Sequence, residues 1–233
     1  GRAMFMSGRY TRAIEHFRVL AERGPTKDVR AEGQKLIGMS LHRLNRHDEA
    51  VAPLRSAEHV LREDADVPAT LAIVFRLLGR LPEALEACDR CLKIDPARRK
   101  TLAAKIDLLL RAGREDEALA TIDRADSLGV TDPHIDIAFA NIAKKTGRLD
   151  VAIRRLERHL DNERLNGADR AIAAFGLGEL LERAGRHEDA WLAYERGNAF
   201  VGLAFDPDKH LADIDLMIER WTPKRIAQLQ AGA

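Results

Sequence analysis

Cys88 and Cys91 are the only cysteines of the chain, and their C-x2-C spacing binds zinc or performs disulfide exchange in other sequences. A structural zinc site needs four ligands, and no second cysteine pair or histidine pair has a matching spacing. Both cysteines instead fall on the apolar side of a predicted helix, where small hydrophobic side chains are needed for packing. We therefore predict that they are buried core residues and that the chain binds no metal.

The eight histidines and the glycine-rich stretch give no catalytic arrangement either. The histidines are scattered along the sequence, and none has a recognisable serine or cysteine nucleophile as a partner. Gly176-x-Gly178 lies in the middle of a predicted helix and follows no strand, so it favours helix packing over phosphate binding. The sequence therefore predicts a chain without catalytic residues or a cofactor.

A repeat that runs through the chain determines where these residues lie. The segment 79–84, Gly-Arg-Leu-Pro-Glu-Ala, joins a Gly-Arg turn to the start of an apolar helix. Related segments end in alanines whose separations are 37, 34, 34, 34 and 38 residues. A fixed period near 34 residues is typical of a helical solenoid, in which short helices fold back on one another in pairs. The alanines are Ala13, Ala50, Ala84, Ala118, Ala152 and Ala190.

The apolar residues around these turns resemble the tetratricopeptide repeat (TPR). In the segment 65–96, Leu71, Ala72 and Phe75 match its first helix, and Ala84 and Pro96 match its second helix and its end. The resemblance implies an all-α fold, a right-handed superhelix of antiparallel helix pairs. The predicted solenoid covers residues 1–202, as a truncated repeat at 1–30 and complete repeats at 31–62, 65–96, 99–130, 133–164 and 171–202.

Charge and composition restrict the kinds of molecule that the chain is expected to bind. Lys and Arg number 38 and Asp and Glu 37, a net charge of +1 that favours neither a nucleic acid nor a membrane surface. No apolar run reaches the roughly 18 residues of a membrane span, and no targeting motif is visible. Two cysteines this close on one helix make a poor disulfide, which favours a reducing compartment. We expect a cytoplasmic protein that binds proteins or peptides.

First helices of such repeats line the concave groove of the superhelix, so their outward residues are the candidate ligand contacts. These residues are mixed in character, with a basic edge that suits an extended, somewhat acidic peptide. Two interpretations remain open, because Lys and Arg near helix ends also complement the helix dipole without any ligand. The candidates are Lys35, Met39, His42, Arg43, Ile73, Arg76, Lys100, Asp107, Arg111, Asn141, Lys144, Lys145, Glu179 and Arg183.

A narrower resemblance covers residues 177–223. It is similar to the last repeat and connector of bacterial TPR–sulfotransferase fusion proteins, through Leu177, Gly178, Ala190, Trp191, Tyr194, Asn198, Phe205, Asp206, Trp221, Thr222 and Pro223. The resemblance implies a neighbouring domain that binds the sulfate donor phosphoadenosine phosphosulfate. The Pro-Arg-Ser-Gly-Thr-Thr loop of that domain does not occur here, so no catalytic or cofactor residue is carried over. The chain alone is expected not to be an enzyme, and the alternative function is a substrate-presenting arm.

Both ends of the chain carry expectations of their own. Residues 203–233 lose the repeat phase, and the apolar periodicity of 209–221 predicts a capping helix followed by a shorter one. Gly1 falls within the first helix of the first repeat, which predicts that the chain is a piece of a longer protein. An open first repeat could also stack on a second copy, so we expect a monomer or a weak homo-oligomer.

Overall fold

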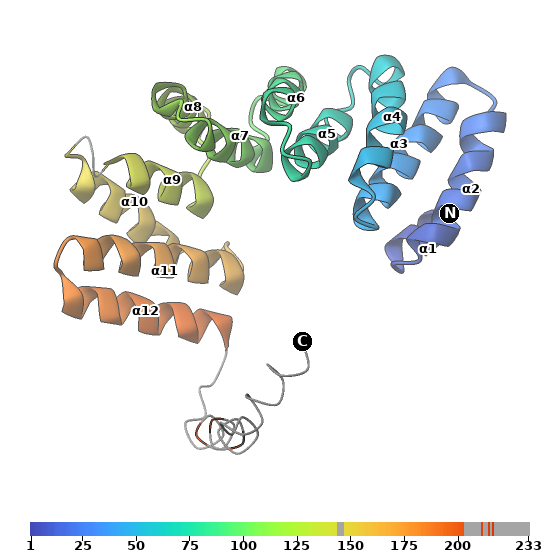
Figure 1. Cartoon of the computed structure of the whole chain (residues 1–233). Helices are drawn as coiled ribbons and strands as arrows, with labels where there is room; N and C mark the ends of the chain where they lie inside the picture. The colour runs from blue at the N-terminus through green and yellow to red at the C-terminus, as the bar shows by residue number, and fades with distance from the viewer. Residues whose placement is uncertain (144–146, 203–210, 212–213, 215, 217–233) are drawn as a thin grey trace, which may run out of the picture. The chain divides into compact units, whose positions relative to one another are not determined.

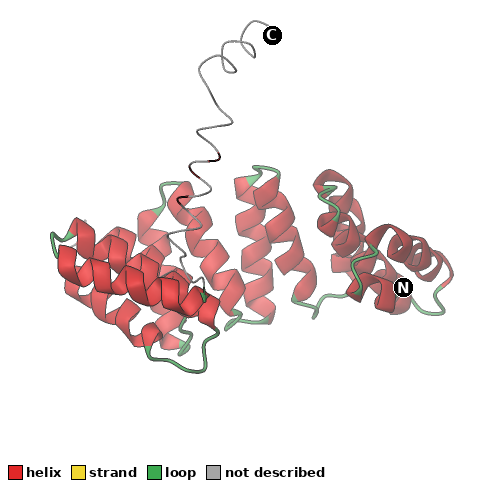
Figure 2. Ribbon diagram, turned by 90° about the horizontal axis from the view of Figure 1, so that it is seen from below, coloured by secondary structure: helices red, strands yellow, loops and turns green. Residues whose placement is uncertain are grey.

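Helices account for every regular element in the described part of the chain. The computed structural model describes residues 1–143, 147–202, 211, 214 and 216. Within these ranges the elements are α-helices and no strand is present (Figure 1, Figure 2). The predicted all-α fold is confirmed. The helices are α1 (Arg2–Met6), α2 (Tyr10–Arg23), α3 (Lys27–Arg43), α4 (His47–Val60), α5 (Asp66–Leu77), α6 (Leu81–Ile94), α7 (Arg99–Arg111), α8 (Glu115–Ser127), α9 (Pro133–Ala143), α10 (Leu149–Leu160), α11 (Gly167–Arg183) and α12 (His187–Val201).

The chain divides into two compact units, Gly1–Arg155 and Leu156–Ala233, with the division inside α10. In the first unit, α3 packs on α4, α5 on α6 and α7 on α8 (Figure 1). Each pair also packs on the next, through α4 with α5 and α6 with α7, and α3 touches α5. In the second unit, α11 packs along α12. Burial within and between neighbouring pairs therefore replaces a single globular core, as in other repeat folds.

The turn inside each helix pair requires a left-handed residue. Gly79 has φ +71°, and the backbone N–H of Arg80 donates to the carbonyl oxygen of Phe75 at 2.9 Å. This bond closes the end of α5 in the manner of a Schellman motif. Asn45 takes the same place between α3 and α4 with φ +58°, and the N–H of Arg46 repeats the bond. Asparagine substitutes here because, after glycine, it is among the residues that tolerate this region best.

The arginine that follows the turn residue serves both helices of the pair. The side chain of Arg80 forms an ion pair with Glu83 in the first turn of α6. The same guanidinium lies over the ring of Phe75 in α5, 4.8 Å from its centroid. Cation–π and ion-pair contacts from one side chain therefore connect the end of one helix to the start of the next. The ion pair recurs between Arg46 and Glu49, Arg114 and Glu117, and Arg186 and Asp189.

Small residues set the distance between paired helices. The repeating alanines at 13, 50, 84, 118, 152 and 190 are at most 2% exposed. Gly38 in α3 faces Leu54 of α4 so closely that a Cβ built on it would lie 2.4 Å from Leu54 Cγ. Gly178 faces the ring of Tyr194 in the same way. The expectation that Gly176-x-Gly178 serves helix packing is met at Gly178.

Some predicted features fall where the structure gives no description. The proposed capping helices of 203–233 lie almost wholly outside the described residues, and so do Lys144 and Lys145. Among the helices that are described, none combines the length and the apolar character that crossing a membrane requires.

Candidate peptide-binding groove

The cysteine pair lies in the core and not at a reactive site. Both side chains are 0% exposed, and burial raises the pKa of the Cys88 thiol to about 12. The sulfur of Cys91 lies 3.4 Å from the carbonyl oxygen of Ala65 and 3.3 Å from Thr101 Oγ1. The described residues contain no cluster of three or more His, Cys, Asp or Glu side chains suited to a metal ion. The predicted packing role of the two cysteines is confirmed.

Three first helices of the first unit share a concave surface. A cavity of about 210 Å³ opens between α3, α5 and α7, and Met39, Ile73 and Ala104 each contribute to its wall from a different helix. We call it the α3–α5–α7 pocket. Its lining consists of Met39, Asp66, Ala69, Thr70, Ala72, Ile73, Cys88, Arg98, Lys100, Thr101 and Ala104.

The wall of the pocket is mostly apolar even where polar residues contribute to it. Thr70 donates its hydroxyl to the carbonyl oxygen of Asp66 at 2.7 Å, one turn back along α5. The hydroxyl of Thr101 is engaged with the Cys91 sulfur. Since both hydroxyls already have partners, they need none from a ligand. Ile73 is 39% exposed although it is a large apolar residue at the middle of the surface.

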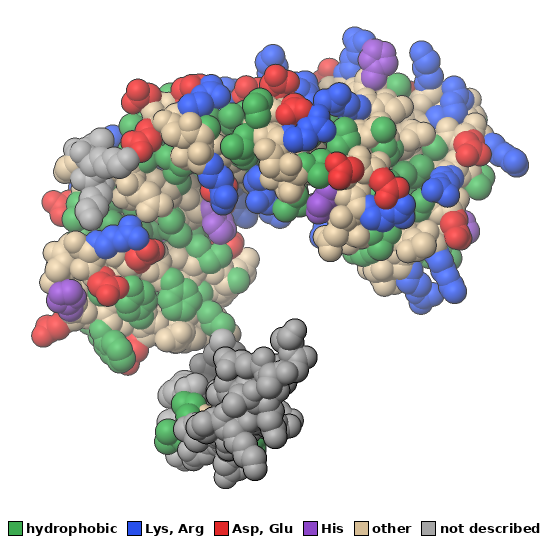
Figure 3. Space-filling view, in the orientation of Figure 1, with side chains coloured by type: hydrophobic (Ala, Val, Ile, Leu, Met, Phe, Trp, Pro, Cys, Tyr) green, Lys and Arg blue, Asp and Glu red, His purple; other side chains and the backbone are tan. Residues whose placement is uncertain are grey.

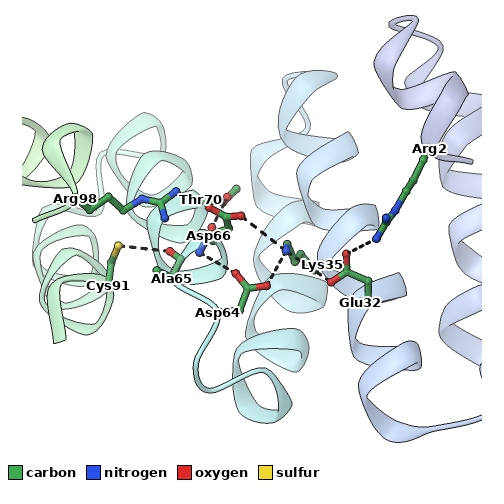
Figure 4. A network of polar contacts seen from close by, with 9 residues as sticks. All are labelled: Arg2, Glu32, Lys35, Asp64, Ala65, Asp66, Thr70, Cys91 and Arg98. Atoms are coloured by element: carbon green, nitrogen blue, oxygen red, sulfur yellow. Dashed lines mark hydrogen bonds and ion pairs between the residues drawn. The ribbon is translucent and has the colours of Figure 1, made fainter. Parts of the chain in front are cut away.

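An ion-pair network occupies one end of this surface (Figure 4). Lys35 Nζ lies 2.6 Å from Asp64 Oδ2, 3.6 Å from Glu32 Oε2 and 3.9 Å from Asp66 Oδ2. Burial by itself would lower the pKa of Lys35, but the hydrogen bond to Asp64 and the nearby carboxylates outweigh it and raise that pKa. Arg98 pairs with Asp66 from the other side. Lys35, a predicted groove contact, is therefore neutralised within the protein.

The opposite end of the surface is a positively charged edge. Arg43 at the end of α3 and Arg76 near the end of α5 are exposed, and neither forms an ion pair with a described residue. His42 precedes Arg43 in α3, and its Nδ1 is 3.4 Å from the Nδ1 of His47. Burial lowers the pKa of His42, and the like charges of His47, Arg43 and Arg76 lower it further. Arg43 and Arg76 thus create a local excess of positive charge.

The remaining candidates that the structure describes behave in two ways: four are paired within their own helix, and the others are exposed. Asp107 and Arg111 neutralise each other across one turn of α7, with Arg111 Nε 2.8 Å from Asp107 Oδ2. Glu179 and Arg183 form the same kind of pair on α11, in the second unit. Asn141 is exposed on α9. Figure 3 shows basic and acidic side chains scattered among apolar ones over the visible face of the first unit.

Several residues of the groove were not among the sequence candidates. The pocket is also lined by Ala69, Thr70, Thr101 and Ala104, whose small side chains leave the space between the larger Met39 and Ile73 open. Small residues at first-helix positions also serve helix packing, so their type alone gave no signal. Lys100, which was a candidate, lies at the pocket, is exposed, and forms no ion pair within the described part of the chain.

Comparisons with known proteins agree with the repeat fold. A family model described as a tetratricopeptide repeat matches residues 1–68 and 137–199, and a second model with the same description matches 75–142. Neither model describes a catalytic domain. A search of curated proteins gives no match.

Solved structures with a similar fold come from several sources. A tetratricopeptide repeat protein from Parabacteroides merdae has a TM-score of 0.66 at 16% identity, over 84% of this chain and 75% of its own. PilF from Pseudomonas aeruginosa has a TM-score of 0.60 at 19% identity, over 89% and 99%. PilW, described as a type IV pilus biogenesis factor, has a TM-score of 0.60 at 18% identity, over 75% and 79%. At these identities the likeness concerns the fold. The matched family models span more than half of the sequence, and the chain belongs to the tetratricopeptide repeat family.

Proposed function

We propose that this chain is a protein-interaction scaffold that binds an extended, acidic peptide across the face formed by α3, α5 and α7. The observation that carries the proposal is the set of exposed cations on this face. Arg43, Arg76 and Lys100 form no ion pair with a described residue, whereas Lys35, Arg98 and Arg111 on the same three helices or beside them do. Cations without an internal partner raise the local positive potential and favour a ligand of opposite charge.

The groove and the charges belong to a surface that has no other evident role. None of the three cations packs in the core, and the pocket that Lys100 helps to line is open to solvent. A surface with an apolar centre and a charged rim is the usual composition of a protein-binding site. Membership of a helical-repeat family supports the same function, since such repeats build extended binding surfaces.

The test is a charge reversal with a matched control. A random dodecapeptide library displayed on phage is selected against the wild-type chain, and enriched peptides are labelled and measured by fluorescence anisotropy. The triple variant Arg43→Glu, Arg76→Glu and Lys100→Glu should weaken binding about tenfold or more, because each exposed ion pair contributes roughly 0.2–1 kcal/mol and the reversal adds repulsion.

The control is the triple variant Arg12→Glu, Lys93→Glu and Arg124→Glu. These three side chains are exposed on the second helices α2, α6 and α8, and none forms an ion pair with a described residue. Both variants change the net charge equally, so a nonspecific charge effect would appear in both. Equal affinities of the two variants, or a failure to enrich acidic peptides, would contradict the proposal.

A second candidate function rests on the residue pattern of 177–223. Its similarity to TPR–sulfotransferase fusion proteins supports a role as a non-catalytic arm that presents substrate to a transferase domain. The measurement is the intact mass of the native polypeptide from its source cells. A product longer by a whole domain beyond Ala233 would support this role, and a product that ends near Ala233 would exclude it.

A further inference from the structure

The size of the α3–α5–α7 pocket limits what can occupy it. Its volume is about 210 Å³, below the roughly 300–1,000 Å³ of sites that enclose a drug-sized molecule. A protein cavity of about 150 Å³ accepts benzene. The pocket therefore accommodates one apolar side chain such as Leu, Ile, Met or Phe, and the rest of the ligand must lie outside it.

The floor of the pocket favours an apolar group. Ala72 and Cys88 at the base are at most 4% exposed, and Met39, Ile73 and Ala104 form the sides. The hydroxyls of the two threonines have internal partners, as described above. A polar side chain placed here would lose its hydrogen bonds to water without gaining new ones, whereas burial of an apolar side chain is favourable.

The rim of the pocket carries one available charge. Arg98 is paired with Asp66, and Lys35, which lies 3.9 Å from Asp66, is paired more closely with Asp64 at 2.6 Å. Lys100 at the start of α7 is exposed and forms no ion pair within the described ranges. A ligand carboxylate next to the apolar group would therefore pair with Lys100, because Arg98 is already paired with Asp66.

We infer that the ligand is a peptide segment that inserts one Leu, Ile, Met or Phe side chain into the α3–α5–α7 pocket and places an Asp or Glu carboxylate beside Lys100. This inference rests on the proposed function, and adds to it the anchor residue and its position. The charged edge at Arg43 and Arg76 then receives acidic residues farther along the peptide.

The experiment uses the peptides enriched from the random dodecapeptide library. We expect them to share one of the four apolar residues with Asp or Glu within two positions of it. Replacement of that apolar residue by Ser should weaken binding to the wild-type chain about tenfold or more, because the burial of its apolar surface in the pocket is lost.

Two variants of the protein locate the effect. Ala104→Leu fills the pocket from α7 and should weaken binding about tenfold, with Ala69→Leu from α5 as a second variant if the first does not fold. Ala52→Leu is the matched control, because Ala52 is exposed on α4. Lys100→Glu should weaken binding more than Lys93→Glu, which reverses an exposed charge on α6.

The outcomes separate the anchor from the groove. If acidic peptides bind and the triple charge reversal weakens them, but the Ser peptide and Ala104→Leu do not, the pocket inference is overturned while the proposed function stands. If no acidic peptide is enriched, both are overturned. Weakening by Ala104→Leu and by Ser replacement, without weakening by Ala52→Leu, supports the inference.

Discussion

The contact between Gly38 and Leu54 gives a quantitative test of how this fold is held together. A Cβ on Gly38 would lie 2.4 Å from Leu54 Cγ and 2.9 Å from Leu54 Cδ2, well inside the roughly 3.5–4.0 Å of an optimal carbon contact. Leu54 is 0% exposed, so it has little room to move away. Gly38→Ala should therefore push α3 and α4 apart.

Two terms of opposite sign determine the expected free energy. Overpacking a filled core costs about 1–3 kcal/mol, and alanine is favoured over glycine inside a helix by about 1 kcal/mol. Gly38→Ala should thus lower the free energy of unfolding by about 1 kcal/mol. Leu54→Ala alone should lower it by about 2–5 kcal/mol through the cavity it leaves.

The double variant, Gly38→Ala with Leu54→Ala, tests whether these two residues interact. Without the leucine side chain, the tightest contact of the new methyl group is lost, and Gly38→Ala should become neutral or stabilising by up to about 1 kcal/mol. The two changes should therefore couple by about 1–2 kcal/mol. Urea unfolding followed by circular dichroism measures each variant, with the slope of the unfolding free energy against urea checked for constancy. Ala52→Gly, at an exposed position of α4, calibrates the helix-propensity term.

Additivity would refute this account. If Gly38→Ala costs the same in the wild-type and Leu54→Ala backgrounds, to within about 0.5 kcal/mol, the two residues do not interact. The close approach of α3 and α4 would then have a different cause.

Three further predictions address the turn, the histidine pair and the cysteines. Gly79→Ala should destabilise the chain by about 1–2 kcal/mol in urea unfolding, because φ is +71° although no atom lies within 4 Å of the new Cβ; no loss of stability would argue against the left-handed turn. The pKa of His42 is lowered from its ordinary 6.5, so folding favours the neutral form of this side chain. The stability that His42 contributes is therefore complete above pH 6.5, and it is lost as the pH falls from 6.5 through the pKa of the folded state. His42→Gln should remove that part of the pH dependence, at most about 1.4 kcal/mol per pH unit, and an unchanged difference between pH 8 and pH 5 would contradict it. Cys88 and Cys91 should react with a thiol reagent only as fast as the protein opens, and rapid labelling of the native chain would show that they are not buried.

The helix pairs could be predicted from local pattern because their cause is local. The spacing of the alanines from Ala13 to Ala190 repeats wherever two helices must approach, and a glycine or asparagine before each arginine marks the left-handed turn. Such signals lie within one repeat, so they can be recognised without knowing how the neighbouring repeats pack. The burial of Cys88 and Cys91 followed for the same reason, since their places in the repeat are packing positions.

The role of the arginine in each turn depends on contacts that the repeat pattern does not state. Arg80 meets Glu83 three residues later, which sequence could suggest, but it also lies over Phe75 on the preceding helix. That second contact exists because the turn brings the end of α5 beside the start of α6. The distance between the two helices is a property of packing and not of either segment alone.

The charge environment of the face formed by α3, α5 and α7 is the feature least accessible to sequence. Lys35 and Lys100 have the same residue type and both lie on first helices, yet Lys35 is neutralised by Asp64, twenty-nine residues away, while Lys100 is exposed without an ion pair to a described residue. The repeat period predicts the face of the helix on which a side chain lies. The charges around that side chain depend instead on which loop of the next repeat packs beside it. Long side chains extend across such distances, so the choice between an internal ion pair and a free cation is made by the packing of neighbouring helix pairs.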